Sequence, residues 1–233
     1  MDKINVSDIT VDVIRKDIKN IHLTIYPPNG RIKVSVPLKV DDESLRLFIV
    51  SKMGWIKKKL KELADQDRQS IRKYVSGENH YYWGKRYILN VIFQKAPLAN
   101  KVVIRNKKYL DLYIRENSSQ QIRKNALYSW YRSELKKEIP TLVAKWEKKL
   151  DVSLLDWGVR SMKTKWGTCN TIAKRIWLNL ELVKKPYQCL DYIVLHEILH
   201  LIERTHSDRF NLLMEKYFPN WKSVRKELNE FIL

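Results

Sequence analysis

Near its carboxyl end the 233-residue chain reads Ile193-Val194-Leu195-His196-Glu197-Ile198-Leu199-His200-Leu201-Ile202. The two histidines are four residues apart, and in a helix that interval brings both imidazoles to one face, about 6 Å apart in rise. The surrounding residues are apolar nearly all round, which predicts a buried helix, and unpaired polar groups are costly there. A metal ion is the simplest partner for two histidines and a glutamate in such a helix.

The same stretch predicts a catalytic rather than a structural metal. Glu197 follows the first histidine, so it can reach a metal-bound water and take its proton, while zinc lowers the pKa of that water toward neutrality. A structural zinc site is closed and needs no base. The motif therefore predicts one zinc ion per chain, bound in part by His196 and His200, with Glu197 as the general base of a hydrolysis.

A catalytic zinc takes a third protein ligand, and two residues compete for that role. In an unbroken helix Glu203 shares the face of His196 and His200, but its short side chain would have to reach back by a full turn. His206 follows His200 by six residues, an interval met in zincins whose helix breaks before the last ligand. His206 is the better candidate if the helix breaks.

One local feature indicates a break near Arg204 and Thr205. Thr205, followed three residues later by Asp208, is typical of the start of a new helix, which places His206 at its mouth. Glu203 stands where the long metzincin motif has a glycine that permits the sharp turn, so the chain is not a metzincin by strict pattern. Geometry without a break still favours Glu203, and the sequence leaves that alternative open.

Several further motifs accompany the histidines. They are His206-Ser207-x-x-Phe210, Ser161-x-Lys163-x-Lys165-Trp166-Gly167-Thr168-Cys169, Leu178-Asn179 and, upstream, Val36-Pro37, Trp55-Ile56 and Tyr82-Trp83-Gly84-Lys85-Arg86-Tyr87. Together with the histidine motif they resemble the YgjP-like metallopeptidase family, relatives of the SprT-like proteases, over most of the chain. Lys165 and Thr168 stand where that family commonly has arginine and serine.

This resemblance implies a compact zincin, an α+β fold with the metal helix beneath a small sheet. It implies three histidine ligands matching His196, His200 and His206, a base matching Glu197, and peptidase activity on a polypeptide substrate. The turn Trp166-Gly167-Thr168 is a candidate border of the substrate cleft, because zincins commonly bind an extended peptide along a sheet edge. A plain turn packed on Trp166 is the competing interpretation.

Hydrophobic periodicity predicts the remaining elements. Alternation and turn residues predict strands, helical spacing predicts helices, and Pro140 is expected to kink or split the second long helix. The predicted elements are a hairpin over 21–36, a helix over 43–63, a small antiparallel sheet over 81–115, a helix over 118–150, strands over 154–162 and 175–182 on either side of a turn at Gly167, and a helix opened by Pro186.

The best candidate for a boundary between two regions is the polar segment Asn117-Ser118-Ser119, which interrupts the hydrophobic pattern. We therefore expect residues 1–117 to be a β-rich amino-terminal region with one long helix, and residues 118–233 to be the zincin-like region that carries the metal motif. The fold class expected is α+β, a small antiparallel sheet with a zincin-type helical metal-binding subdomain.

The composition limits which binding partners and which cellular location are expected. Forty-five Lys and Arg against 26 Asp and Glu give a formal charge of +19, which favours either a polyanionic partner or a very soluble surface. Nucleic acid is therefore a possible partner. Two cysteines are too few for a disulfide framework, no apolar leader opens the chain, and no apolar run spans a bilayer, so we expect a cytoplasmic protein without a membrane segment.

Other functions and residues remain open at this stage. A zinc hydrolase of a non-peptide amide or ester uses the same chemistry, and a nucleic-acid-associated protein could carry the zinc as a structural ion or cleave DNA-bound proteins. Spacing does not determine the oligomeric state or rank the oxyanion-stabilising candidates Tyr192, Tyr217, Arg160 and Arg209. Four residues are expected not to be ligands: His22, His80, Cys169 and Cys189.

Overall fold

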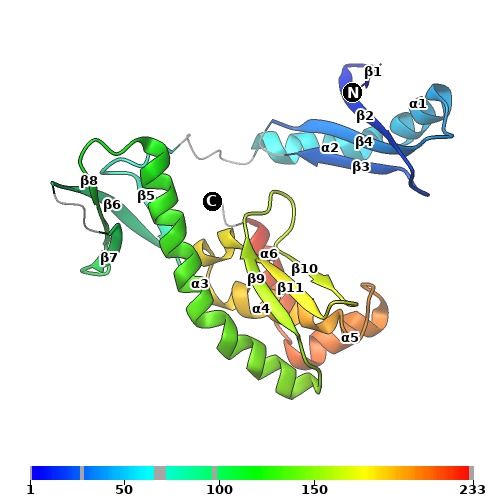
Figure 1. Cartoon of the computed structure of the whole chain (residues 1–233). Coiled ribbons are helices and arrows are strands. Elements are labelled where there is room, and N and C mark those ends of the chain that lie inside the picture. Colours follow the sequence, from blue (N-terminus) through cyan, green and yellow to red (C-terminus); the bar gives the residue numbers. More distant parts are fainter. Residues whose placement is uncertain (1, 27–28, 66–71, 96–98, 231–233) are drawn as a thin grey trace. The chain divides into compact units, whose positions relative to one another are not determined.

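The computed structural model describes residues 2–26, 29–65, 72–95 and 99–230 (Figure 1). The chain divides into two compact units, Met1–Arg68 and Gln69–Leu233. The boundary predicted after residue 117 falls inside the second unit, between a strand and the long helix that follows it. The division into a region 1–117 and a region 118–233 therefore stays a prediction.

The first unit is a four-stranded sheet with two helices. Its strands are β1 (Asp2–Val6), β2 (Ile9–Lys16), β3 (His22–Tyr26) and β4 (Arg31–Pro37), in the order β1-β2-β4-β3, followed by α1 (Asp42–Ser51) and α2 (Met53–Asp65). Antiparallel pairing of β3 with β4 confirms the predicted hairpin. Its core joins alternate residues of β2 and β4 to one face of the helices, namely Val11, Val13, Ile32, Val34, Val36, Leu45, Ile49 and Ile56.

The predicted single helix over 43–63 was wrong, because two helices meet at Lys52. The Lys52 N–H donates to the carbonyls of Phe48 and Ile49, which mixes i−4 with i−3 bonding. The Ser51 hydroxyl also donates to the Phe48 carbonyl, at 2.7 Å. A side chain that bonds to the backbone in this way competes with the helical ladder, and the helix ends there.

The second unit begins with another four-stranded sheet and a long helix. Its strands are β5 (Asn79–Tyr82), β6 (Lys85–Gln94), β7 (Lys101–Arg105) and β8 (Tyr109–Arg115), in the order β5-β6-β8-β7. The pairs β5–β6 and β7–β8 are antiparallel, but β6 and β8 are parallel. The first unit's sheet has the same strand order, with β2 and β4 as its parallel pair. The α+β class is confirmed, and each of the two four-stranded sheets is mostly antiparallel.

Helix α3 (Gln120–Leu150) is continuous, so Pro140 does not split it. Ser119 caps its first turn and Asp151, in the left-handed conformation, ends it. Proline removes one backbone hydrogen bond, but apolar residues on both sides of it are buried at helical spacing and hold the helix in place. These are Leu127, Tyr131, Leu135, Ile139, Leu142, Val143, Trp146 and Leu150.

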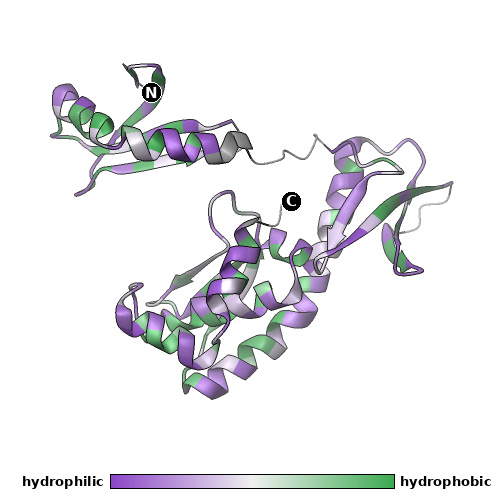
Figure 2. Ribbon diagram, turned by 180° about the vertical axis from the view of Figure 1, so that it is seen from behind, coloured by the Kyte–Doolittle hydropathy of each residue, from purple (hydrophilic) through white to green (hydrophobic). Residues whose placement is uncertain are grey.

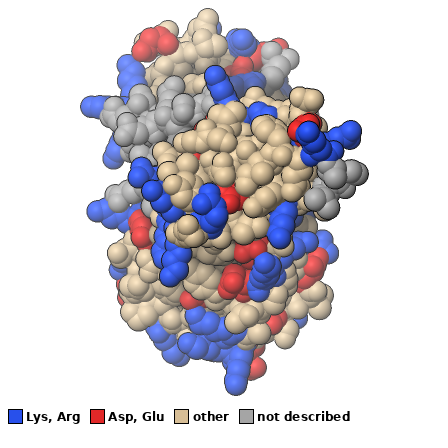
Figure 3. All heavy atoms as spheres, turned by 90° about the vertical axis from the view of Figure 1, so that its left-hand side faces the viewer, with Lys and Arg blue, Asp and Glu red and all other residues tan. Residues whose placement is uncertain are grey.

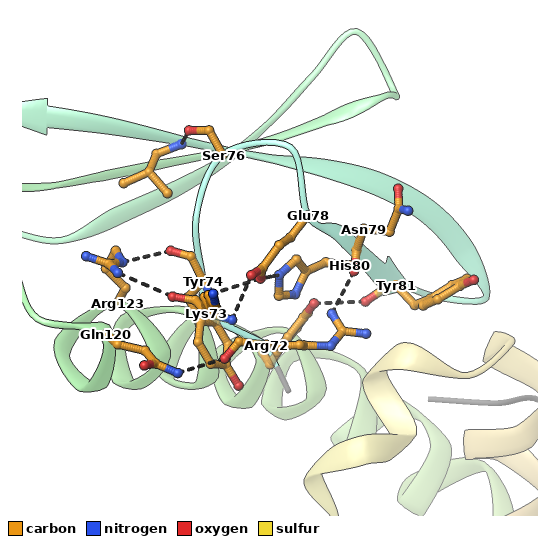
Figure 4. A network of polar contacts seen from close by, with 12 residues as sticks. Arg72, Lys73, Tyr74, Ser76, Glu78, Asn79, His80, Tyr81, Gln120 and Arg123 are labelled. Atoms are coloured by element: carbon orange, nitrogen blue, oxygen red, sulfur yellow. Dashed lines mark hydrogen bonds and ion pairs between the residues drawn. The ribbon is translucent and has the colours of Figure 1, made fainter. Parts of the chain in front are cut away.

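A polar network attaches the segment before β5 to the start of α3 (Figure 4). Arg123 Nε donates to the Tyr74 carbonyl at 2.7 Å, and Gln120 Nε2 donates to the Arg72 carbonyl at 2.8 Å. His80 lies inside this network and is only 1% exposed. Its Nε2 is 3.5 Å from the Glu78 carboxylate without making a hydrogen bond to any described residue.

The last part of the chain is a three-stranded sheet over a buried helix. Strands β9 (Asp156–Arg160), β10 (Gly167–Asn170) and β11 (Arg175–Asn179) have the order β10-β11-β9, so β10 is an edge strand. The 3-10 helix η1 (Leu180–Lys184) leads to α4 (Tyr187–Leu199), and α5 (Asp208–Tyr217) and α6 (Trp221–Glu230) follow. Helix α4 packs against β10, β11, α3 and α6. Pro186 opens α4 as predicted, whereas Gly167 begins a strand and not a turn.

Hydrophilic residues are spread over most of the helices (Figure 2). No helix in the described part of the chain is both long enough and apolar enough to cross a membrane. Lys and Arg side chains are scattered over the face shown in Figure 3, with acidic side chains among them. Nucleic-acid contact and a cytoplasmic location therefore stay predictions of the sequence alone.

Candidate active site

The metal motif lies at the end of α4 and in the turn that follows it. Helix α4 ends at Leu199, with His200 as its C-cap, and the next helix begins at Asp208. The break comes earlier than the predicted position near Arg204 and Thr205. The predicted cap Thr205 was also wrong, because Ser207 is the N-cap of α5 and its hydroxyl accepts from the Phe210 N–H at 3.2 Å.

This break brings the three histidines of the motif together. The Nε2 atoms of His196 and His206 are 3.0 Å apart, and one ring nitrogen from each of the three residues lies within 4.8 Å of the others. The ring centroids of His196, His200 and His206 are 4.9–5.0 Å apart. The Phe210 ring lies 5.0 Å from all three and stacks on His200, so it closes one side of the group.

The second nitrogen of His200 has a defined partner. Its Nδ1 lies 3.1 Å from the Glu203 carbonyl, which can only accept, so Nδ1 carries the proton and donates. That tautomer leaves Nε2 of His200 with a free lone pair. The Glu203 carboxylate accepts from the Thr205 hydroxyl at 3.3 Å and is not part of the histidine group.

His196 is neutral in this environment. Burial, together with the charges of His200, His206 and Arg225, lowers its pKa to about 3. Its Nδ1 is buried and has no hydrogen-bond partner among the described residues. A neutral imidazole is the form that coordinates a metal ion.

Glu197 is buried against a glycine of the edge strand. It is 5% exposed, and a Cβ placed on Gly167 would lie 2.5 Å from its Oε1. Burial raises the pKa of Glu197 to about 8, and the charge of Lys165 opposes that shift. Only a residue without a side chain at position 167 allows the carboxylate to lie where it does.

A cavity of about 670 Å³ opens in front of this group. His196, Glu197, His200 and His206 line it from one side. The predicted cleft residues Trp166, Gly167 and Thr168 line it from the side of β10, together with Cys169. The Trp166 indole N–H donates to Asn229 Oδ1 of α6 at 3.3 Å, which joins the start of β10 to α6.

The structure separates the four oxyanion candidates. Tyr192 lines the cavity one helical turn before His196, and their rings are 5.9 Å apart. Tyr217 and Arg209 are not among the lining residues, and the Arg160 guanidinium lies 3.3 Å from the centre of the Trp177 ring. Neither cysteine and neither of the other two histidines, in β3 and β5, joins the metal-ligating group found among the described residues.

Sequence reasoning missed one cationic wall of the cavity. Arg204 and Arg225 both line it, the second from α6. Arg225 comes near the histidines only through the packing of α6 on α4, so spacing along the chain carries no signal for it. Arg204 lies between two histidines of the motif, and that proximity could have identified it.

The chain is similar to the zymogens of two metallopeptidases of known structure. Pyrococcus abyssi abylysin is 22% identical with a TM-score of 0.36, over 39% of this chain and 90% of that one. Methanocaldococcus jannaschii jannalysin is 21% identical with a TM-score of 0.36, over 40% of this chain and 94% of that one.

No curated protein matches the chain. The model of the YgjP-like metallopeptidase domain matches residues 19–231, which include every residue of the histidine group and its cavity. Because that match spans nearly the whole sequence, the chain belongs to the YgjP-like family and is a metallopeptidase.

Proposed function

We propose that this metallopeptidase binds one zinc ion through His196, His200 and His206. The observation that carries the proposal is the convergence of one nitrogen from each residue to within 4.8 Å, across a helix break. Two nitrogens bound to one tetrahedral zinc at the usual bond length lie roughly 3.3 Å apart. The 3.0 Å separation of the Nε2 atoms of His196 and His206 is close to that value.

The donor set supports zinc in particular. Three neutral imidazoles suit zinc, and a catalytic zinc site has three protein ligands and an open fourth position. The Glu203 carbonyl fixes the tautomer of His200, as partners of metal-bound histidines commonly do. Zinc bound there supplies a Lewis acid for the scissile carbonyl and lowers the pKa of a bound water.

We propose Glu197 as the general base. It follows a proposed ligand on the same helix and lines the cavity. It is buried and accepts no hydrogen bond from any described side chain, so a structural hydrogen bond does not explain its position. Its carboxylate takes a proton from the attacking water and returns it to the leaving nitrogen of the peptide. The Tyr192 hydroxyl, in the same wall, is the candidate donor to the oxygen that becomes negative in the transition state.

The edge strand β10 supports an extended polypeptide substrate. It has a hydrogen-bonded neighbour, β11, on one side, and Gly167 and Thr168 border the cavity. A peptide that adds to such an edge gains main-chain hydrogen bonds, and its scissile bond is then held beside the histidines. The strand at Gly167 and its place in the cavity lining favour the cleft interpretation of Trp166-Gly167-Thr168 over a plain turn.

Metal analysis and a peptide assay together test this proposal. We expect the purified chain to contain about one zinc per molecule, to lose hydrolysis of a peptide library with a chelator, and to recover it with zinc. Full-length protein in which His196 and His200 are both replaced by alanine is the matched control and should contain no zinc. A wild type without stoichiometric metal would contradict the proposed site.

A further inference from the structure

The charges on the cavity wall are strongly unequal. Its lining includes three cationic side chains, Lys165, Arg204 and Arg225, and a single acidic one, Glu197. Glu197 is buried, whereas all three cations are exposed. Within the part of the chain that the structure describes, none of the three forms an ion pair with an acidic side chain.

Arg225 is the cation with a fixed place relative to the histidines. Its neighbours Val224 and Leu228 are 2% and 1% exposed and anchor α6, which packs on α4. One turn earlier Trp221 lines the same cavity, and one turn later Asn229 bonds to Trp166. Helix α6 is therefore held in place on both sides of Arg225 along the cavity.

Arg225 also shares the cavity with the catalytic centre. His196, His206 and Tyr192 line the same cavity as Arg225. These three residues come from two different parts of the chain and face the same cavity. A group bound by the guanidinium would thus lie beside the bond that the peptidase cleaves.

We propose that Arg225 binds a carboxylate of the polypeptide substrate next to the scissile bond, and so determines substrate specificity. The inference rests on the proposed function of the same cavity. Carboxylates are the anionic groups that an unmodified polypeptide offers, and the planar fork of arginine binds them through two parallel hydrogen bonds. The carboxylate is either the carboxyl terminus of the substrate or an Asp or Glu side chain.

A binding experiment tests the proposal without turnover. The zinc-loaded full chain carrying Glu197→Gln is titrated with matched peptides that differ only in one carboxylate, as free acid against carboxamide at the end, and as Glu against Gln inside. We expect one of these pairs to differ in affinity by about tenfold, the size of an exposed charge-assisted hydrogen bond. The pair that differs identifies the source of the carboxylate.

Arg225→Gln in the same background should reduce that preference to about one, and Arg225→Lys should restore part of it, because lysine keeps the charge without the fork. Lys226→Gln removes the same charge from the next residue of α6, which does not line the cavity, and should leave the preference unchanged. Equal binding of all peptides by the parent protein overturns the proposal. So does a uniform loss of affinity in Arg225→Gln, which would indicate a structural role.

The two proposals fail in different ways. The carboxylate preference of the metal-free chain can be measured by the same titration, so it does not depend on zinc or on hydrolysis. Absence of zinc with a preserved, Arg225-dependent preference contradicts the metal site alone. Normal zinc binding and hydrolysis without any carboxylate preference contradicts the role of Arg225 alone.

Discussion

Gly167 of β10 and Glu197 of α4 lie in direct contact, and a Cβ on the glycine would approach Oε1, Cγ and Cδ of the glutamate to 2.5, 2.7 and 2.8 Å. The backbone of Gly167 has no positive φ, so alanine could adopt it without strain. Glycine is needed at this position for the space that it leaves. The edge strand and the proposed base are therefore positioned by one another.

Gly167→Ala should impair hydrolysis while zinc is retained. The added methyl group must displace the Glu197 carboxylate, and a displacement of about 1 Å can cost on the order of 100-fold in rate. Peptide kinetics and metal content of the purified variant check this. Gly54→Ala, in α2, is the control, because its Cβ would meet nothing within 4 Å. Unchanged kinetics in Gly167→Ala would mean that the carboxylate does not work from this position.

Glu197→Gln should keep zinc and lose hydrolysis by about 100-fold or more, because the amide preserves shape but cannot take a proton. The measurement is the hydrolysis rate of a peptide that the wild type cleaves, with the zinc content of both proteins determined alongside. Substantial remaining activity would exclude Glu197 as the base. Loss of zinc together with activity would instead indicate a structural effect.

His80 should make the protein sensitive to acid. Burial, followed by the charges of Arg72 and Lys184, lowers its pKa to about 3, and the nearby Glu78 carboxylate does not reverse this. In the unfolded chain the pKa is about 6.5, so between these values only the unfolded state takes up the proton. Stability from this residue is therefore complete above about pH 6.5 and is lost as the pH falls.

The expected loss is about 2 kcal/mol between about pH 7.5 and about pH 5. Urea unfolding at both pH values measures it, and His80→Gln should show a smaller difference between the two pH values than the wild type. His22→Gln is the control, since His22 is exposed in β3. The same pH difference in His80→Gln and the wild type would show that His80 is not the source.

The metal helix could be predicted because local information defines it. His196 and His200 share a helical face by spacing alone, and the apolar residues between them predict burial. The helix break could be predicted only approximately. Thr205 and Ser207 are both suited to cap the next helix, because each precedes residues suited to a first helical turn. Ser207 is the cap in the structure, where Phe210 packs against the histidines, and that tertiary contact is not readable from local sequence.

The direction of strand pairing and the cationic side of the cavity could not be predicted from local sequence patterns. Alternation has a period of two in parallel and antiparallel strands alike, so the residues of β6 and β8 could not reveal that these strands run parallel. For the same reason the sequence could not predict that the two four-stranded sheets share one strand order. Arg225 joins the cavity only through the docking of a separate helix.

The third ligand gives the sharpest test of the helix break. In a continuous helix Glu203 would share the face of His196 and His200, but here its carboxylate accepts from Thr205 and only its backbone carbonyl reaches His200. The Nε2 of His206, in contrast, is 3.0 Å from that of His196. Removal of one of three ligands should weaken zinc binding much more than removal of a carboxylate outside the group.

His206→Ala should therefore weaken zinc affinity by about tenfold or more, whereas Glu203→Ala should change it by less than about threefold, since the backbone carbonyl that orients His200 remains. Competition with a chromogenic chelator measures both affinities, and circular dichroism confirms that both variants are folded. The reverse order would mean that the helix continues through Arg204 when the ion binds, with Glu203 as the third ligand. Equal, small effects would mean that two histidines suffice and that the site is not of the catalytic three-ligand kind.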